Sequence, residues 1–384
     1  MPRYTSTLRI PRFRTPARKE GKMKQTFRIL AINPGSTSTK ISVFENEREV
    51  WNLKLSHGVE ELAPFEKIVD QYDFRRRVIV SELEKAGFGI SSFDAVVGRG
   101  GVLYPVEGGT YAVNALMLMH VHDGVQGEHP SNLGALIADS FSKESGCPAY
   151  ITDPVVVDEM KPLARYSGLP QLPRRSILHA LNQKATARKA CEDLGRKYED
   201  VNLIVVHLGG GISVGAHCHG RIIDVNNALN GDGPFSPERS GGLPVGDLMA
   251  LCYSGKHTLD QMKKLNKGAG GMVAYLGTND MREVEKRISA GDTHAEEVYE
   301  AMAYQVAKEI GFLAPVTNGS VDAIVLTGGI AYDEKFISWI RSRVSFIAPV
   351  LVYPGEHEME ALALGGLRVL RGIEKARIYA PVIP

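Results

Sequence analysis

The sequence contains the stretch Ile32-Asn33-Pro34-Gly35-Ser36-Thr37-Ser38-Thr39-Lys40, and a second stretch with the same plan follows at Val206-His207-Leu208-Gly209-Gly210-Gly211-Ile212-Ser213-Val214. Each follows an apolar run typical of a buried strand, and each leads into a second apolar run. Glycine and hydroxyl residues occupy the expected tip, where glycine lets the backbone turn and N–H groups face an anion. The sequence therefore predicts two β-hairpins that bind phosphate.

A second pair of segments indicates an internal duplication. Phe93-Asp94-Ala95-Val96-Val97-Gly98-Arg99-Gly100-Gly101 resembles Val321-Asp322-Ala323-Ile324-Val325-Leu326-Thr327-Gly328-Gly329 in composition and order. Each half of the chain thus has a hairpin followed by a buried strand that ends in glycine. Glycine-rich turns after strands are common singly, but four in this order favour two similar α/β domains. Facing one another, they could hold a nucleotide from both sides.

The remaining pattern sets the expected domain bounds. At 384 residues the chain is long enough for two separate cores. We expect a first domain at residues 23–172 and a second, with the nucleotide site, at residues 173–356. A closing helix in residues 357–384 is expected to pack back on the first domain. Ligands of α/β folds usually bind at the carboxyl ends of strands, so Arg99 beside Gly100 is an expected site residue.

Two helices are expected next to this site. Ser131 precedes an apolar pattern of helical period that starts at Leu133, so the Ser131 hydroxyl is expected to cap that helix. Arg174 to Leu194 is expected to form one long helix that connects the domains. That helix would carry His179.

The composition excludes several classes of protein. The 45 Lys and Arg residues nearly balance the 44 Asp and Glu residues, so the chain has no overall field for a nucleic acid or a membrane surface. No apolar run approaches the roughly 20 residues of a membrane-spanning helix. The cysteines form no C-x-x-C pair, which is typical of reduced thiols in a cytoplasm and predicts no zinc or iron–sulfur site; they are Cys147, Cys191, Cys218 and Cys252. Neighbouring strand residues point to opposite faces, so His217-Cys218-His219 is not expected to bind a metal.

The first 22 residues differ from the rest. They contain seven basic residues and one acid, with prolines that interrupt any helix. We expect this segment to be disordered or loosely attached. It could be a targeting or nucleic-acid-binding arm, but our interpretation is an extension upstream of a natural start at Met23.

Three segments together carry a resemblance to a known family. Asn33 to Lys40, Arg174 to Ala180 and His207 to Gly211 resemble, in this order, three signatures of the acetokinase family of carboxylate kinases. The resemblance covers the chain from about Phe27 to Arg371. It implies two duplicated domains of the actin-like and sugar-kinase-like superfamily, with a ribonuclease H-like α/β fold and a cleft between them.

Two further segments point to one branch of this family. Gly231 to Gly242 and Pro354 to Glu358 resemble the branch that phosphorylates butyrate. The resemblance implies direct in-line transfer from ATP, with Mg²⁺, which gives butyryl phosphate and ADP. Acetate, propionate and branched-chain acids are alternatives; more distant ones are a sugar kinase, a nucleotide-binding regulator of the same superfamily, or a protein that only binds partners. Family members associate through the second domain, so a homodimer or larger homo-oligomer is expected.

Phosphorylation of a carboxylate needs positive charge more than a base. A carboxylic acid with a pKa of about 4.3 is ionised at neutral pH, so the nucleophile is already formed. Cations and hydrogen-bond donors must then hold two anions in line. By the resemblance, Arg99 holds the carboxylate, His179 donates to the transferring phosphoryl group, and His207 contacts the nucleotide phosphates.

The resemblance also implies further contacts. Those to the nucleotide are Asn33, Gly35, Ser36, Thr37, Lys40, Gly209, Gly210, Gly211, Gly328 and Gly329. Asp153 is assigned a catalytic role, and Mg²⁺ is assigned to Asn33, Asp153 and one of Glu356, Glu358 and Glu360, of which Glu358 aligns best. Lys40 could instead be a solvated strand residue, and Asp153, which precedes Pro154, could be a turn former.

Two departures from the family pattern concern the substrate. The family's second active-site arginine has no counterpart in Leu243 to Asp247, and Arg239 is expected to replace it. The expected substrate pocket contains Gly100, Gly101, Leu178 and Pro237. The two glycines stand where acetate kinases have bulky branched residues, so we expect room for a longer acyl tail. Two methylenes at about 0.8 kcal/mol each give a preference of only about tenfold, which Gly101→Val is expected to change.

Overall fold

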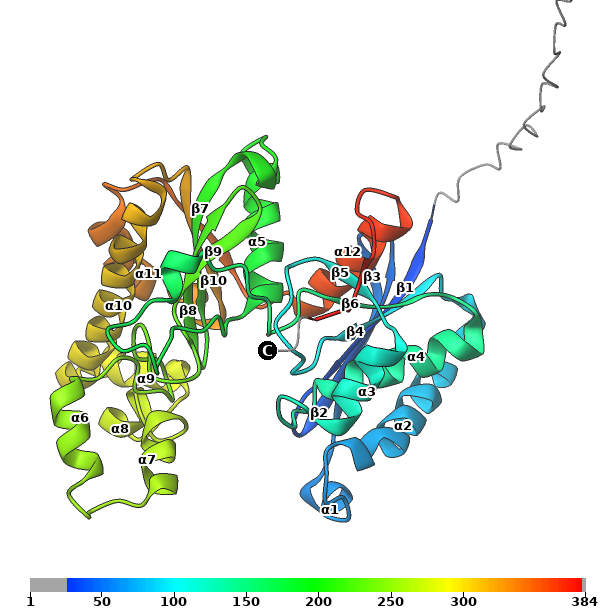
Figure 1. Cartoon of the computed structure of the whole chain (residues 1–384), viewed down its shortest axis with the longest axis horizontal. Helices are drawn as coiled ribbons and strands as arrows, with labels where there is room; N and C mark the ends of the chain where they lie inside the picture. Colours follow the sequence, from blue (N-terminus) through cyan, green and yellow to red (C-terminus); the bar gives the residue numbers. More distant parts are fainter. Residues whose placement is uncertain (1–25, 382–384) are drawn as a thin grey trace, which may run out of the picture.

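The computed structural model describes residues 26–381, which form two α/β halves, each built on its own sheet (Figure 1). The basic segment, residues 1–22, lies outside the described residues, so its expected disorder stays a prediction. None of the helices within residues 26–381 is both long and apolar enough to cross a membrane. The halves lie side by side in Figure 1.

Seven strands among the described residues form the first sheet, in the order β12-β5-β6-β4-β1-β2-β3. β1, β2 and β3 are antiparallel neighbours, whereas β4 is parallel to β1 and β6 is parallel to β4. The bounds are Arg28–Pro34 for β1, Ser38–Glu45 for β2, Arg48–Ser56 for β3, Ala95–Arg99 for β4, Thr110–Ala112 for β5, Ala149–Thr152 for β6 and Arg377–Ile378 for β12.

Five strands of the described chain form the second sheet, in the order β11-β10-β7-β8-β9. β7, β8 and β9 are antiparallel neighbours, whereas β10 is parallel to both β7 and β11. The bounds are Asn202–Leu208 for β7, Ile212–Cys218 for β8, Arg221–Val225 for β9, Ala323–Gly328 for β10 and Val350–Pro354 for β11.

The two sheets share one topology. The strands β3-β2-β1-β4-β6 correspond in order and direction to β9-β8-β7-β10-β11. Both glycine-tipped segments are antiparallel hairpins, with tips at residues 35–37 and 209–211. The expected duplicated α/β fold is therefore confirmed.

Helices cover the faces of both sheets (Figure 1). The longest, α10, lies beside α11 on the second sheet. The helix bounds are Val59–Leu62 for α1, Tyr72–Lys85 for α2, Ala115–Asp123 for α3, Asn132–Ser145 for α4, Ala180–Asp193 for α5, Val245–Cys252 for α6, Leu259–Asn266 for α7, Met272–Leu276 for α8, Met281–Ser289 for α9, Thr293–Leu313 for α10, Glu334–Val344 for α11 and Glu358–Leu370 for α12.

The first sheet is buried on both faces. Side chains alternate along a strand, so Leu30 and Ile32 of β1 pack with α2 and α4, whereas Ile29 and Ala31 pack with α12. Figure 1 draws α12 in red beside the blue and cyan strands of the first half. The end of the chain thus returns to the first sheet and brings Glu358, its first helical residue, to the site.

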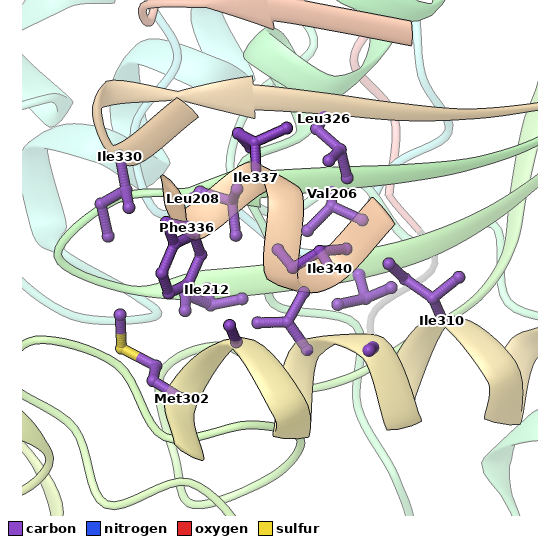
Figure 2. Packing of buried hydrophobic residues seen from close by; sticks show 14 of the residues in the cluster. Val206, Leu208, Ile212, Met302, Ile310, Leu326, Ile330, Phe336, Ile337 and Ile340 are labelled. Carbon is purple, nitrogen blue, oxygen red and sulfur yellow. The ribbon is translucent and has the colours of Figure 1, made fainter. Parts of the chain in front are cut away.

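The second sheet is buried in the same way. Leu203 and Val205 of β7 pack with Ala187 and Ala190 of α5. Figure 2 shows the opposite face, where side chains from β7, β8 and β10 interlock with those of α10 and α11: Val206, Leu208, Ile212, Leu326, Met302, Ile310, Phe336, Ile337 and Ile340. These two packed faces keep the ends of β7 and β10 rigid beneath the site.

The connecting helix is shorter than expected. A helix over Arg174 to Leu194 was the prediction, but α5 begins at Ala180 and His179 occupies its N-cap position. The preceding segment is bound to the second half instead: Ile177 O accepts from Ala228 N at 3.0 Å, and Arg174 donates to Asp224 at 2.8 Å. His179 therefore enters the site from the start of α5.

The predicted side-chain cap at Ser131 is also wrong. The residue does precede α4, but its backbone is already helical and its hydroxyl makes no capping hydrogen bond. The Ser131 Oγ atom instead lies 2.8 Å from His129 Nδ1. This pair belongs to the wall of the site.

Candidate active site

A central cavity of about 420 Å³ lies between the two halves. It collects many of the predicted site residues from distant parts of the chain: Asn33, Gly35, Lys40, Arg99, Gly100, Leu178, His179, Arg239 and Glu358. Most of its other lining residues are apolar, namely Val102, Val155, Val156, Ile177, Ala228 and Leu229. A cavity with an apolar wall and a few converging polar groups suits a small amphipathic ligand.

Arg75 of α2 holds the tip of the first hairpin. This side chain is fully buried, and its guanidinium donates to the backbone oxygens of Gly35 at 2.8 Å, Ser36 at 3.0 Å and Ser38 at 3.0 Å. It also donates to Thr39 Oγ1 at 2.9 Å. Burial lowers the pKa of Arg75 to about 10, so the group stays charged at neutral pH. The tip is therefore fixed by one cation behind it.

The hairpin tip differs in detail from the prediction. Ser36 and Thr37 are exposed and do not line the central cavity, which Ser38 lines instead. Lys40 lines the cavity, with its Nζ atom 3.9 Å from Glu356 Oε2. The structure thus brings neither Ser36 nor Thr37 into the cavity.

Arg99 and Glu358 form an ion pair at the cavity wall. The second carboxylate oxygen of Glu358 accepts from Asn33 Nδ2 at 2.7 Å. Burial raises the pKa of Glu358, but the positive charges of Arg99 and Lys40 and these hydrogen bonds outweigh burial and lower it overall. Glu358 is therefore ionised at neutral pH, and Arg99 is already placed on a carboxylate.

His179 and His207 stack beside this ion pair. Their ring centroids are 3.9 Å apart and the rings are inclined by 16°. Burial lowers the pKa of His207 to about 4, although the charge of Glu358 acts the other way. Burial, the neighbouring His207 and the charges of Arg239 and Arg99 hold the pKa of His179 well below its ordinary value. Both imidazoles are therefore neutral at pH 7.

Arg239 reaches the cavity across the second hairpin. A Cβ atom at Gly211 would lie 1.7 Å from Arg239 Nη1, so only glycine lets the guanidinium lie against the hairpin. Arg239 donates to Ala228 O at 2.6 Å, and its buried Nε has no hydrogen-bond partner among the described residues. Burial lowers the pKa of Arg239. A guanidinium that lines a cavity is suited to bind an anion there.

A second cavity, of about 540 Å³, lies beyond the second hairpin. Predicted residues Gly209, Gly210 and Gly329 line it, together with Ile330 and the segment 279–282. Gly328 stands just behind it, where φ is +97° and a Cβ atom would lie 2.2 Å from Leu208 O, so the paired-glycine turn requires glycine there. The sequence prediction missed the segment 279–282.

Asp153 lies outside both cavities. Its side chain is fully buried, accepts from Gly109 N at 2.6 Å and pairs with Arg188 at 3.3 Å. Burial raises its pKa, but the charges of Arg188, Lys184 and Arg368 outweigh burial and lower it overall. The catalytic and metal roles of Asp153 thus stay predictions that this geometry does not support, because the carboxylate holds Arg188 of α5 inside the protein.

The glycine explanation for acyl-chain length is also wrong. A Cβ atom at Gly100 would lie 2.5 Å from Pro154 Cβ, and one at Gly101 would lie 2.5 Å from Asn132 Oδ1. The space that larger residues would fill is thus taken by protein atoms. Gly101 does not line the central cavity, and Pro237 lines the second one, whereas Leu178 is in the predicted place.

The side chains at this site fit Mg²⁺ only when phosphate oxygens of a nucleotide supply the other ligands of the ion. Within residues 26–381, no three His, Cys, Asp or Glu side chains converge on one point that could hold a metal ion. Mg²⁺ commonly binds one or two carboxylates together with phosphate oxygens and water. The ionised Glu358 beside the Asn33 amide at the cavity wall is a donor set of that kind.

The sequence did not predict two residues that support the site, Arg75 and His129. Arg75 is one of three consecutive arginines in α2, and only its position on the helix face that carries Ile79 and Leu83 signals burial. His129 lines the cavity with Ser131; burial and the charge of Arg99 lower the pKa of His129. These residues take their place through packing of α2 and α4, which no local motif records.

The chain resembles curated relatives over nearly its whole length. It is 56% identical over 353 residues to butyrate kinase 2 of Clostridium acetobutylicum, which covers 92% of this chain and 99% of the relative. Butyrate kinase 1 of the same organism is 55% identical over 353 residues, with the same coverage. The model of the acetokinase family matches residues 171–345. The chain belongs to the acetokinase family. The resemblance drawn from the three signatures is thereby confirmed.

Solved structures agree with the fold of this acetokinase family member. The acetate kinase of Porphyromonas gingivalis superimposes with a TM-score of 0.73 at 19% identity and covers 90% of this chain and 100% of that chain. A propionate kinase of Francisella tularensis gives a TM-score of 0.68 at 18% identity, with 88% and 98% covered. At these identities the likeness concerns the fold alone.

Proposed function

We propose that this chain transfers the γ-phosphoryl group of ATP to the carboxylate of a short-chain fatty acid, with butyrate as its main substrate. The products are an acyl phosphate and ADP. The observation that carries the proposal is Arg99 held on a carboxylate at the edge of an apolar cavity, with two neutral histidines beside it. The two relatives named butyrate kinases, at 55% and 56% identity, support the choice of butyrate.

Arg99 would bind the substrate carboxylate. Its present partner is the carboxylate of Glu358, so the position already suits a carboxylate. The substrate acid is ionised at neutral pH and needs no base. Its oxygen would then face the γ-phosphorus for an in-line displacement, in which the new carboxylate oxygen–phosphorus bond forms as the bond to the ADP oxygen breaks.

Positive charge and donors from the second half would stabilise the phosphoryl group in transfer. Arg239 lines the same cavity as Arg99 and carries a positive charge, so it would take the place of the family's second arginine. His179, which lines the same cavity, would donate a hydrogen bond to the phosphoryl group. The glycines 209–211 and 328–329 would bind the nucleotide, whose base would occupy the second cavity, and His207, which lines neither cavity, would stack on His179.

Mg²⁺ would be held by Glu358 and Asn33 together with the phosphates of ATP. When bound, the ion would supply charge that neutralises the phosphate oxygens. Lys40, near Glu356 at the edge of the cavity, would add a positive charge on the same side.

The apolar wall would set the acyl preference. Val102, Val155, Val156, Leu178 and Leu229 line the cavity that Arg99 also lines, so a propyl tail would leave water as the carboxylate binds. Two methylenes contribute about 1.6 kcal/mol, so butyrate is expected to exceed acetate by roughly tenfold. Propionate, valerate and branched acids would be slower substrates of the same site.

The geometry argues against the alternative that the protein is a sugar kinase. Such an enzyme needs a base for the sugar hydroxyl, usually an aspartate, and Asp153 is buried in an ion pair away from the cavity. Trapping with hydroxylamine separates the possibilities, because an acyl phosphate forms a hydroxamate and a sugar phosphate does not. The proposal expects hydroxamate with butyrate, ATP and Mg²⁺. ADP release from ATP and a sugar without hydroxamate from any acid would overturn it.

The cellular compartment and the oligomeric state are also part of the proposal. The chain would work in the cytoplasm, where ATP is available, as a homodimer or larger homo-oligomer. The division at residues 172 and 356 would separate two bodies that close on the nucleotide and the acid, with residues from 357 onward moving with the first.

A further inference from the structure

A buried chain of hydrogen bonds ends at His179. Tyr198 Oη lies 2.7 Å from His217 Nδ1, and His217 Nε2 lies 2.9 Å from Gln183 Oε1. Gln183 Nε2 is 3.0 Å from Ser213 O and 2.8 Å from Ser213 Oγ. The Ser213 hydroxyl is in turn 3.0 Å from His179 Nδ1. His217, Gln183 and Ser213 are fully buried, so these groups have no access to water.

The donor and the acceptor of each hydrogen bond in this buried series follow from one atom, the carbonyl oxygen of Ser213. Ser213 O is a backbone carbonyl and can only accept, so the amino group of Gln183 must face it. The carbonyl oxygen of Gln183 then faces His217, which must donate from Nε2. Burial and the charges of Lys184 and Arg188 lower the pKa of His217, so this neutral ring has a bare Nδ1 that accepts from Tyr198.

The same reasoning fixes the hydrogen on His179. Ser213 Oγ accepts from Gln183 Nε2 and, at 3.5 Å, from the backbone N–H of His179, so its own hydrogen points to His179 Nδ1. A neutral imidazole that accepts at Nδ1 carries its hydrogen on Nε2. His179 is therefore a donor at Nε2.

The stacked partner has the opposite arrangement. Asn182 Nδ2 donates to Glu356 O at 2.7 Å, so Asn182 Oδ1 is left to accept from His207 Nδ1 at 2.7 Å. The neutral His207 ring therefore has a bare Nε2. The two rings, 3.9 Å apart, present one N–H and one lone pair, and the two arrangements are set by different side chains of α5.

We propose that Ser213, Gln183 and His217 are positioning residues that hold His179 in the form with hydrogen on Nε2, ready to donate to the transferring phosphoryl group. This rests on the proposed function of His179. In the other form, the ring would turn a lone pair toward phosphoryl oxygens and oppose the transfer. Because these hydrogen bonds set only the position of the hydrogen on the His179 ring, they affect kcat more than the binding of either substrate.

Ser213→Ala tests the proposal with little change in shape. Gln183 keeps its bond to Ser213 O, and only the hydroxyl that faces His179 is lost. We expect kcat to fall by about tenfold to a hundredfold while KM for butyrate and for ATP stays within about twofold. Ser176→Ala is the matched control, because Ser176 is also buried and donates to Val157 O at 2.8 Å, outside the chain of hydrogen bonds. Its kcat should stay within about twofold of the wild type.

Two further measurements separate positioning from a structural role. Nitrogen-15 NMR of the His179 ring should show hydrogen on Nε2 in the wild type and a mixture of both forms in Ser213→Ala. In a His179→Ala background, Ser213→Ala should reduce kcat no further. An unchanged kcat in Ser213→Ala, a wild-type ring with hydrogen on Nδ1, or an equal further loss in the His179→Ala background would each overturn the proposal. If the wild type makes no acyl phosphate, the proposed function fails, while the NMR result still decides the hydrogen position.

Discussion

Arg99, the last residue of β4, forms an ion pair with Glu358, the first residue of α12, across 259 residues of sequence. The carboxylate of Glu358 thus binds the Arg99 guanidinium, which we assign to the substrate carboxylate. Under the proposed function, binding of the acid would draw Glu358 away from Arg99, and Mg²⁺ that arrives with ATP would be the new partner of Glu358. The ion pair would therefore link the proposed acid site to the proposed nucleotide site.

Glu358→Gln should separate these two roles. Loss of the internal competitor is expected to lower KM for butyrate severalfold, because Arg99 is then free. Loss of the charged ligand is expected to lower kcat by at least about tenfold and to raise the Mg²⁺ concentration needed for half-maximal rate. Steady-state rates at varied butyrate and Mg²⁺ measure both effects.

The matched control is Glu360→Gln, which removes a half-exposed carboxylate from the same turn of α12. It should leave both parameters close to wild type. A Glu358→Gln enzyme with unchanged Mg²⁺ dependence would remove Glu358 from the metal site.

Arg75→Met should loosen the first hairpin. The substitution leaves partly buried carbonyl groups of the tip without their donor, which is expected to destabilise the protein by about 2–4 kcal/mol. A mobile tip should also weaken nucleotide binding. Urea unfolding and calorimetric titration with ADP measure the two effects. Arg77→Met, on the exposed face of the same helix, should change neither. Wild-type stability in Arg75→Met would contradict the role given to this side chain.

His207 should make stability depend on pH in a defined window. Its pKa is about 4 in the folded protein against an ordinary 6.5, so between these values the unfolded chain binds a proton that the folded one does not. Stability is full above pH 6.5, decreases as pH falls toward 4, and is lower by about 2 kcal/mol at pH 5 from this group.

His179 and His217 act in the same direction, since their pKa values are also lowered. The difference between wild type and His207→Asn isolates the His207 contribution in urea unfolding at pH 7 and pH 5. The variant should lose less stability over this range. An equal loss would mean that His207 keeps an ordinary pKa.

Gly101→Val should damage the fold and not the chain-length preference. The added Cβ would lie 2.7 Å from Asn132 Cα, which cannot move without shifting the start of α4, so we expect a destabilisation of about 1–3 kcal/mol. Activity with all acids should fall together. Val155→Phe, inside the cavity wall, should instead shift preference toward acetate. Unfolding temperatures and rates with acetate and butyrate test both variants. A stable Gly101→Val enzyme that selectively lost butyrate would restore the original explanation.

The sequence pattern correctly predicted those elements that depend on residues close together in the sequence. The hairpins at residues 35–37 and 209–211 are marked by glycine between apolar runs, and the paired order of segments disclosed the duplication. Arg99 and Leu178 could be placed in the cavity because each lies in a motif beside a strand end or a helix start.

Tertiary packing decided the rest. Asp153 has the sequence context of a site residue, yet Arg188 of α5 binds its carboxylate in the interior. The space near Gly101 was expected to be empty, but Asn132 at the start of α4 fills it. Both cases depend on what lies opposite a residue, and the opposing residue comes from an element whose position is set by the whole core.

The most direct test of the central claim is the comparison of kcat/KM for acids from acetate to valerate, branched isomers included, with acyl phosphate measured as hydroxamate in the presence of ATP and Mg²⁺. The account predicts a maximum at butyrate, roughly tenfold above acetate, and a large rise in KM for every acid in Arg99→Ala. A maximum at acetate would contradict the assignment of butyrate, and hydroxamate formation that survives unchanged in Arg99→Ala would contradict the carboxylate site itself.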